Sequence, residues 1–164
     1  MQKKLKTVAV GGTFDELHKG HRILLMRAFE IGEKVLIGLS SDEFAEKLGR
    51  QKSHAIACYE NRLAELKEFL RRNDFLERAK IIPLNDAYGV TLSRDVLDAL
   101  VVSRETEYMA QEINKKREKK GLEPLKIIVI EMVPAENHVP ISTTRIRRGE
   151  IDREGHLLKR LRNA

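Results

Sequence analysis

Two histidines near the N-terminus follow a short run of strand-forming residues and a pair of glycines. The run ends at Gly11-Gly12, and His18 and His21 stand where an amphipathic pattern begins. Residues three apart share one face of a helix, so both imidazoles can reach the same ligand. The N–H groups at a helix N-terminus also attract anions. The pattern predicts a phosphate-binding site.

Two other interpretations of this segment stay open. Paired glycines after a strand also occur in ordinary turns, and neighbouring histidines also occur in metal sites. Zinc needs about three protein ligands even in an open catalytic site, whereas Cys58 is the single cysteine and no acidic residue stands at an obvious third position. The loop is not a Walker P-loop, because no Gly-Lys-Ser/Thr closes it. We therefore expect no protein-bound metal.

The chain order alternates apolar runs with amphipathic stretches. Strands are expected at 7–11, 34–39, 79–82, 99–102 and 125–132, and helices at 20–31, 41–48, 59–72, 105–120 and 142–148. Gly32 is expected to cap the first helix and Pro83 to end the third strand. This order predicts an α/β fold, a Rossmann-like doubly wound five-stranded parallel sheet in a single domain, 1–164, with 150–164 a C-terminal helical tail.

Polar residues follow each expected strand, at 11–21, 40–41, 85–91, 103–106 and 141–147. Ligands of open parallel sheets bind beyond the carboxyl ends of the strands, where the strand order switches. One shared cleft is therefore expected.

The composition fits one domain with a proper core, since 41% of the 164 residues are hydrophobic. A single cysteine suits a reducing cytosol, and no segment approaches the ~20 apolar residues of a membrane span. We expect a soluble cytoplasmic protein with no membrane partner. The net charge of +6 requires nucleic acid to be considered. Few aromatic residues could stack on bases, however, so we expect no nucleic-acid partner, and a non-catalytic nucleic-acid-binding module is the remote alternative.

Two motifs carry a resemblance to a known family. Gly12–Asp15 followed by His18-x-Gly20-His21 resembles the defining motif of the nucleotidylyltransferase superfamily, and is distantly similar to the HIGH box of class I aminoacyl-tRNA synthetases. Near the other end, Ile141–Arg147 resembles the family's I-S-S/T-T-x-I-R box. The likeness spans about residues 7 to 150.

The resemblance implies transfer of a nucleotidyl group from a nucleoside triphosphate, with pyrophosphate as the leaving group. His18 would stabilise charge at the α-phosphate, Thr13 would donate to the attacking oxygen, and Mg²⁺ would be bound through the ATP phosphates. The expected ATP-binding residues are Gly11, Gly12, Thr13, Phe14, His18, Gly20, His21, Ser142, Thr143, Thr144 and Arg147. As an alternative, Ser142 only caps a helix.

Three basic residues have expected roles that rest on the resemblance. Lys47 and Lys52 lie near the position at which relatives place a phosphate-contacting lysine, and Lys47 is the expected catalytic one. Arg62, at a Y-E-x-R helix start, would face the nucleotide. The alternative for Arg62 is an ion pair with Glu65 on the helix surface.

The middle of the chain indicates the acceptor. The segments 85–91 and 101–106 resemble those of archaeal and eukaryotic phosphopantetheine adenylyltransferases, except that Ala87 and Val90 replace prolines. The expected acceptor-binding residues are Asp86, Tyr88, Ser103 and Thr106, although Asp86 and Tyr88 also fit an ordinary turn. The implied reaction is 4′-phosphopantetheine plus ATP giving dephospho-coenzyme A. The alternatives are CTP with an alcohol phosphate, or ATP with FMN or a nicotinamide nucleotide.

Overall fold

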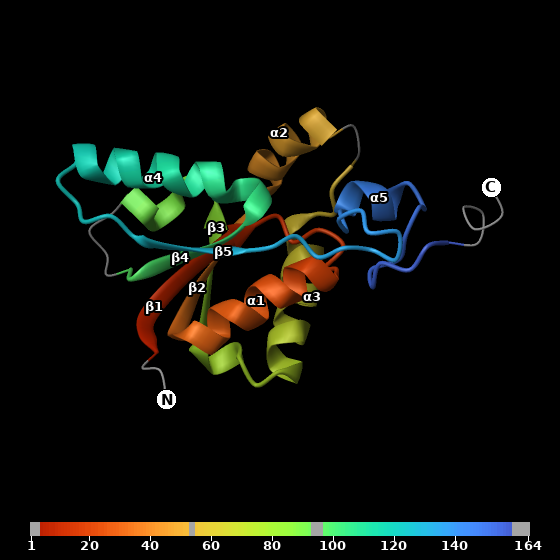
Figure 1. The fold of residues 1–164 in the computed structure, drawn as a ribbon, viewed down its shortest axis with the longest axis horizontal. Helices are drawn as coiled ribbons and strands as arrows, with labels where there is room; N and C mark the ends of the chain where they lie inside the picture. The colour runs from red at the N-terminus through yellow and green to blue at the C-terminus, as the bar shows by residue number, and fades with distance from the viewer. Residues whose placement is uncertain (1–3, 53–54, 93–96, 159–164) are drawn as a thin grey trace.

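Five parallel strands form the centre of the computed structural model, which describes residues 4–52, 55–92 and 97–158. The strands are β1 (Leu5–Gly12), β2 (Gly32–Ser40), β3 (Ala79–Leu84), β4 (Ala99–Ser103) and β5 (Lys126–Ile130). Their order in the sheet is β3-β2-β1-β4-β5 (Figure 1). The direction of winding therefore reverses between β1 and β4. The expected doubly wound parallel sheet is confirmed.

Helices cover both faces of the sheet. Figure 1 shows α1 (Lys19–Ile31) and α3 (Tyr59–Arg72) on one side, with α2 (Asp42–Lys52) and α4 (Glu107–Lys119) on the other. Alternate residues of β1 point to opposite faces. Val8 and Val10 pack in the core beneath α1 and α3, whereas Ala9 packs with the residues of α4. Both faces are thus buried, which explains the continuous apolar runs of the strands.

Two expected element ends differ in the structure. Gly32 is the C-cap of α1 as expected, with its N–H donating to the carbonyl of Ala28, but its backbone is extended (φ −113°, ψ 138°) instead of left-handed and begins β2 directly. A Cβ atom at Gly32 would lie 2.7 Å from Cγ2 of Val8, so glycine serves a close approach between β1 and β2. Pro83 does not end β3 but pairs with Leu39 inside it. Proline is tolerated there because β3 is an edge strand.

Short turns complete the connections. Three 3₁₀ turns lie in the connections: η1 (Leu76–Arg78) precedes β3, η2 (Gly89–Leu92) lies between β3 and β4, and η3 (Arg104–Thr106) precedes α4. The five-residue helix α5 (Thr143–Arg147) follows β5. Helix α4 therefore begins at Glu107, two residues later than expected. Within the described ranges, every helix is too short or too polar to cross a bilayer.

Residues 150–158 form a turn instead of the expected helical tail. Ile151 and Leu157 pair in an isolated antiparallel bridge. Oδ1 of Asp152 accepts hydrogen bonds from the backbone N–H groups of Glu154 (2.9 Å) and His156 (2.8 Å). Gly155 lies between them at φ +88°. These bonds use the amides that a helix would need, so the segment turns back; residues 159–164 lie outside the described part of the chain.

Candidate active site

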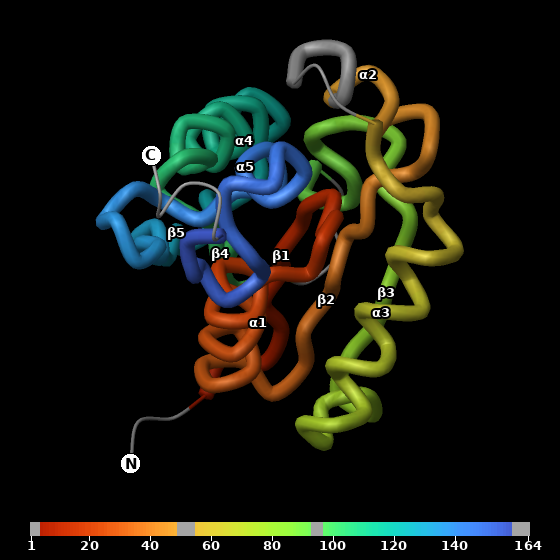
Figure 2. Tube along the Cα trace, turned by 90° about the vertical axis from the view of Figure 1, so that its right-hand side faces the viewer, coloured from red at the N-terminus to blue at the C-terminus, as the bar shows by residue number. Residues whose placement is uncertain are grey.

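A cavity of about 810 Å³ lies at the carboxyl-terminal edge of the sheet, and residues that follow all five strands line it. Figure 2 looks onto this edge, with α5 in front of it. The residues expected in the site that line the cavity are Gly11, Gly12, Thr13, Phe14, His18, Gly20, His21, Tyr88, Ser103, Thr106, Ser142, Thr143 and Thr144. The two motifs at opposite ends of the chain therefore share one cavity.

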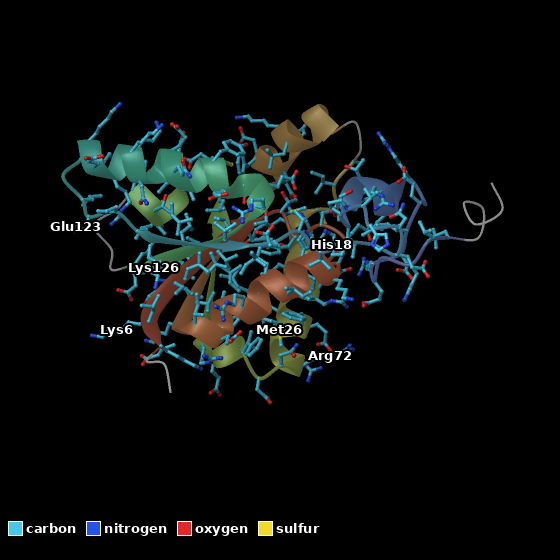
Figure 3. All side chains as sticks on the ribbon, viewed as in Figure 1. Lys6, His18, Met26, Arg72, Glu123 and Lys126 are labelled. Atoms are coloured by element: carbon cyan, nitrogen blue, oxygen red, sulfur yellow. The ribbon has the colours of Figure 1, made fainter. Side chains whose placement is uncertain are left out.

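His18 and His21 form the start of α1 together. Nδ1 of His18 accepts hydrogen bonds from the N–H groups of Gly20 (3.0 Å) and His21 (3.4 Å), and Nδ1 of His21 accepts one from the N–H of His18 (3.2 Å). The two rings stack with their centroids 3.7 Å apart. This is a capping box made of two imidazoles instead of Ser and Glu. Figure 3 shows His18 at the end of α1 nearest α5.

The caps fix which ring nitrogens can donate. An Nδ1 that accepts a backbone hydrogen bond carries no proton, so the ring proton of a neutral imidazole is on Nε2. Both histidines line the cavity, and His18 is only 6% exposed. The start of α1 can thus present two Nε2–H donors to an anion.

The backbone amides of the first helical turn are already used. The N–H of Lys19 donates to the carbonyl of Arg153 at 2.9 Å, and those of Gly20 and His21 donate to His18. The sequence led us to expect free amides here, and the structure differs because the histidines themselves cap the helix. The imidazoles therefore replace the amides as donors, while the helix dipole still favours an anion.

Gly20 and Phe14 keep the two rings in place. A Cβ atom at Gly20 would lie 2.9 Å from Cε1 of His18, so only glycine leaves room for this ring. Phe14 is 1% exposed and meets the ring of His21 edge-on, with centroids 5.4 Å apart. Phe14 has φ +50°, a strained conformation that persists only where surrounding contacts hold it.

Asp15 joins the N-terminal loop to α5. Its carboxylate accepts two hydrogen bonds of 2.9 Å from Nε and Nη2 of Arg147, and its carbonyl accepts one of 3.0 Å from Oγ1 of Thr143. The carboxylate is 3% exposed. The hydrogen bond to Asp15 raises the pKa of the Arg147 guanidinium above its ordinary value. Such planar, bidentate pairs fix geometry as well as charge.

Arg147 therefore differs from its expected role. We expected it to hold phosphate, but its guanidinium is paired with Asp15 and it does not line the cavity. Arg147 instead anchors α5, whose residues Ser142 and Thr144 do line the cavity. Ser142 is also the N-cap of α5, because its Oγ accepts from the N–H of Arg145 at 3.3 Å.

Arg62 holds the loop that follows β1 through buried hydrogen bonds. It is 2% exposed and donates to the carbonyls of Ala57 (2.7 Å), Thr13 (3.0 Å) and Ser40 (2.8 Å). Its guanidinium also lies 3.2 Å from a carboxylate oxygen of Asp42. Arg62 pairs with Asp42, so the ion pair with Glu65 that the sequence left as an alternative does not form, and Arg62 is not among the residues that line the cavity. It ties the ends of β1 and β2 together.

The wall near β3 and β4 carries the expected acceptor residues. Asp86 is exposed and does not line the cavity; its Oδ1 accepts from the N–H groups of Tyr88 and Gly89, both at 2.8 Å, which is the turn that the sequence left as an alternative. Oγ of Ser103 lies 3.3 Å from Oγ1 of Thr106. Nζ of Lys116 lies 4.7 Å from the centre of the Tyr88 ring.

Leu84 forms part of this wall and is surrounded by glycines. Cβ atoms at Gly38 and Gly89 would lie 2.7 and 2.5 Å from its side chain, and one at Gly11 would lie 3.2 Å away. Glycines from three segments of the chain therefore make room for the side chain of Leu84. Gly89 also has φ +51°.

Other charged residues lie at the rim or away from the cavity. Lys47 is exposed on α2 and does not line the cavity, in contrast to its expected catalytic role; of the side chain of Lys52 nothing is described. At the rim, Arg104 donates to Glu131 and Glu107. The hydrogen bond from Arg104 lowers the pKa of Glu131. Among the described residues, no group of three or more His, Cys, Asp and Glu could hold a metal ion.

Residues 9–149 match the model of one protein family, described as cytidylyltransferase-like. The chain belongs to the cytidylyltransferase-like family. Curated relatives named phosphopantetheine adenylyltransferase include one from Methanothermobacter thermautotrophicus, 49% identical over 100% of this chain and 96% of its own. Another, from Pyrococcus furiosus, is 45% identical over 98% of each chain. The resemblance stated from the motifs is confirmed.

Two solved structures are similar to this fold. A protein of unknown function from Archaeoglobus fulgidus is 32% identical, with a TM-score of 0.69 over 84% of this chain and 100% of its own. A tyrosyl-tRNA synthetase from the same organism has a TM-score of 0.61 at 13% identity, over 87% of this chain and 60% of its own. The second likeness concerns the fold alone.

Proposed function

We propose that this protein transfers the adenylyl group of ATP to 4′-phosphopantetheine, giving dephospho-coenzyme A and pyrophosphate. One observation carries the proposal: His18 and His21 at the start of α1, and the hydroxyl residues at the start of α5, line the same cavity. Its support from relatives is the group of archaeal proteins, 45–49% identical, that carry this enzyme's name.

The donors fit an in-line attack on the α-phosphorus. The phosphate monoester of the acceptor is largely dianionic at neutral pH, so it needs no general base. Catalysis then depends on positioning and on stabilising charge. Nε2–H of His18 stabilises charge at the α-phosphate, while His21, Ser142 and Thr144 hold the other phosphates. Magnesium arrives with ATP as part of the substrate, because Mg²⁺ prefers phosphate oxygens and water.

The rest of the cavity suits an acceptor whose flexible arm carries both apolar and hydrogen-bonding groups. Aliphatic residues of the strands and α4 line it, among them Leu36, Leu84, Val102 and Ile113. Ser103, Thr106 and Tyr88 supply a small number of hydroxyls on the same wall. Pockets of this kind, mostly apolar with a few placed polar groups, bind small organic ligands. We place the reaction in the cytoplasm, which the single cysteine of the chain suits.

The test is formation of dephospho-coenzyme A from ATP, Mg²⁺ and 4′-phosphopantetheine by the purified protein. A panel replaces ATP with CTP, and the acceptor with an alcohol phosphate, FMN or nicotinamide mononucleotide. Turnover at least about tenfold faster with the proposed pair supports the proposal, since each tenfold in kcat/KM is a difference of about 1.4 kcal/mol in transition-state binding. Faster turnover with another pair reassigns the acceptor. Salt-dependent binding of RNA that survives His18→Ala, without turnover, would favour a nucleic-acid-binding module.

A further inference from the structure

Residues 150–158, called here the C-terminal turn, contact the start of α1 although they follow the last residue that the family model matches. The carbonyl of Arg153 accepts a hydrogen bond from the N–H of Lys19 at 2.9 Å. Lys19 directly follows His18, whose ring caps the next two amides. The C-terminal turn thus satisfies the one amide of the first helical turn that His18 does not.

The side chain of Arg153 holds the loop in front of His18. Its Nε donates to Glu16 at 3.0 Å, and its Nη1 and Nη2 donate to the carboxylate of Glu65 on α3 at 3.3 and 3.2 Å. Glu16 stands two residues before His18 and has φ +55°, a conformation that needs external support. Arg153 therefore connects this strained residue to a helix that packs against the sheet.

The C-terminal turn is itself held by an independent set of contacts. Ile151 is 1% exposed and packs with Ala135 and Ile141 in a small apolar cluster. The N–H of Leu157 donates to a carboxylate oxygen of Glu136 at 2.7 Å, and the N–H of Glu136 donates to the carbonyl of Gly155 at 2.8 Å. Arg153 is presented from a supported turn instead of a free tail.

We propose that Arg153 is a positioning residue that sets the orientation of the His18 and His21 imidazoles. This inference rests on the proposed adenylyl transfer for its effect on turnover. Arg153 does not line the cavity, so its side chain acts through Glu16, while its backbone carbonyl, which a substitution keeps, holds the N–H of Lys19. Its side chain and that of Glu65 are each 44% exposed, and ion pairs with this exposure contribute little to stability. A positioning role therefore predicts an effect on turnover that is out of proportion to the effect on folding.

The kinetic experiment compares Arg153→Ala with Arg72→Ala, which removes an exposed arginine that pairs with Glu68 at the far end of α3 (Figure 3). We expect Arg153→Ala to lower kcat by about tenfold, since small displacements of catalytic groups are costly, with KM for ATP changed by less than about twofold. Arg153→Lys, which keeps a cation near Glu16 and Glu65, should recover part of the loss. Arg72→Ala should match the wild type. Equal kcat for Arg153→Ala and wild type would overturn the proposal.

A second readout does not depend on turnover. ¹H–¹⁵N spectra of the imidazoles should show both His18 and His21 as Nε2–H tautomers in the wild-type protein, with assignment from His18→Ala and His21→Ala. Arg153→Ala should shift the nitrogen signals of both rings toward an average of tautomers, and Arg72→Ala should not. Unchanged imidazole signals in Arg153→Ala would also overturn the proposal, even if the wild type shows no adenylyl transfer.

If Arg153→Ala does not fold, a milder variant tests the proposal. Glu65→Gln removes the negative charge of one carboxylate that holds Arg153, and Glu68→Gln is its control on the same helix. Lower kcat and shifted imidazole signals in Glu65→Gln alone support the proposal. Identical behaviour of the two variants contradicts it.

Discussion

The two helix starts that line the cavity use their capping residues differently. At α1 the cap is His18, whose ring accepts the backbone hydrogen bonds, and both His18 and its capping-box partner His21 line the cavity. At α5 the cap, Ser142, also lines the cavity, whereas Arg147 of the same motif is bound to Asp15 and does not. At α1 both histidines of the motif therefore combine capping with a place in the cavity, whereas at α5 the hydroxyl residues line the cavity and the arginine holds the helix in position.

This difference teaches how a motif should be interpreted. An arginine in a phosphate-binding motif suggests a phosphate ligand, but Nε and Nη2 of Arg147 donate to the buried carboxylate of Asp15. An imidazole has two nitrogens, so one can serve the backbone while the other serves a ligand. The position of the side chain decides its role here, since His18 lines the cavity and Arg147 does not.

The largest effect is expected from removing the buried arginine that holds the loop before α1. Arg62→Leu removes hydrogen bonds to the carbonyls of Thr13, Ser40 and Ala57 and leaves them unsatisfied. We expect a loss of about 4 kcal/mol in the free energy of unfolding, since each buried unpaired group is costly. Urea denaturation measures it. Arg71→Leu, an exposed site on the same helix, should leave it nearly unchanged.

The α1 start is tested by separating its cap from its chemistry. We expect His18→Ala to lower kcat by about a hundredfold or more, as for one lost transition-state donor, and to cost about 1 kcal/mol of stability. His18→Asn should restore the stability, because an asparagine oxygen also caps helices, but not the turnover. Near-normal kcat in His18→Asn would remove the imidazole from the reaction. Kinetics and thermal unfolding are measured on both variants.

The α5 start is tested by a substitution that keeps the positive charge of Arg147 and removes its paired hydrogen bonds to Asp15. Arg147→Lys retains a cation beside Asp15 but cannot make the two parallel hydrogen bonds. We expect kcat/KM to fall by about tenfold, because α5 shifts relative to His18. Arg148→Lys, an exposed neighbour, is the control. If Arg147→Lys had the same kcat/KM as Arg148→Lys, the position of α5 would not depend on the paired geometry.

The smallest effect is expected at an ion pair far from both starts. Hydrogen bonds from Arg71 and Arg72 lower the pKa of Glu68 from 4.5 to about 2 in the folded protein. A lowered pKa stabilises the fold above the unfolded value, and this contribution is lost as pH falls from about 4.5 through about 2. Glu68→Gln should therefore slightly reduce stability at pH 7 and flatten the acid side of the stability profile. Turnover at pH 7 should not change; a change would link this pair to the site.

The sequence predicted the sheet well because apolar runs between amphipathic stretches leave few arrangements. It predicted the location of the site for a similar reason: parallel strands bring all their carboxyl ends to one edge. Side-chain partners were harder. Asp15 and Arg147 are 132 positions apart, and spacing alone does not show that a cation meets a carboxylate before it meets phosphate.

Gly32 and the C-terminal turn show a second limit of prediction from the sequence. Gly32 caps the helix as expected, yet the need for glycine there comes from the side chain of Val8 on another strand. The segment 150–158 was expected to be helical, but Asp152 and Gly155 close it into a turn. The role of Arg153 had one local signal, an Asp-x-x-Gly turn, and nothing in the sequence indicated that the turn reaches Lys19.

Leu84 and its surrounding glycines constrain one another across three segments. A side chain at position 38 would overlap Leu84, so among related proteins a residue larger than glycine there should occur together with a smaller residue at position 84. The same exchange would make room at position 11. Position 89 would stay restricted, because its backbone has φ +51°. Substitutions at these sites should therefore be inherited as a set, with the leucine changing first.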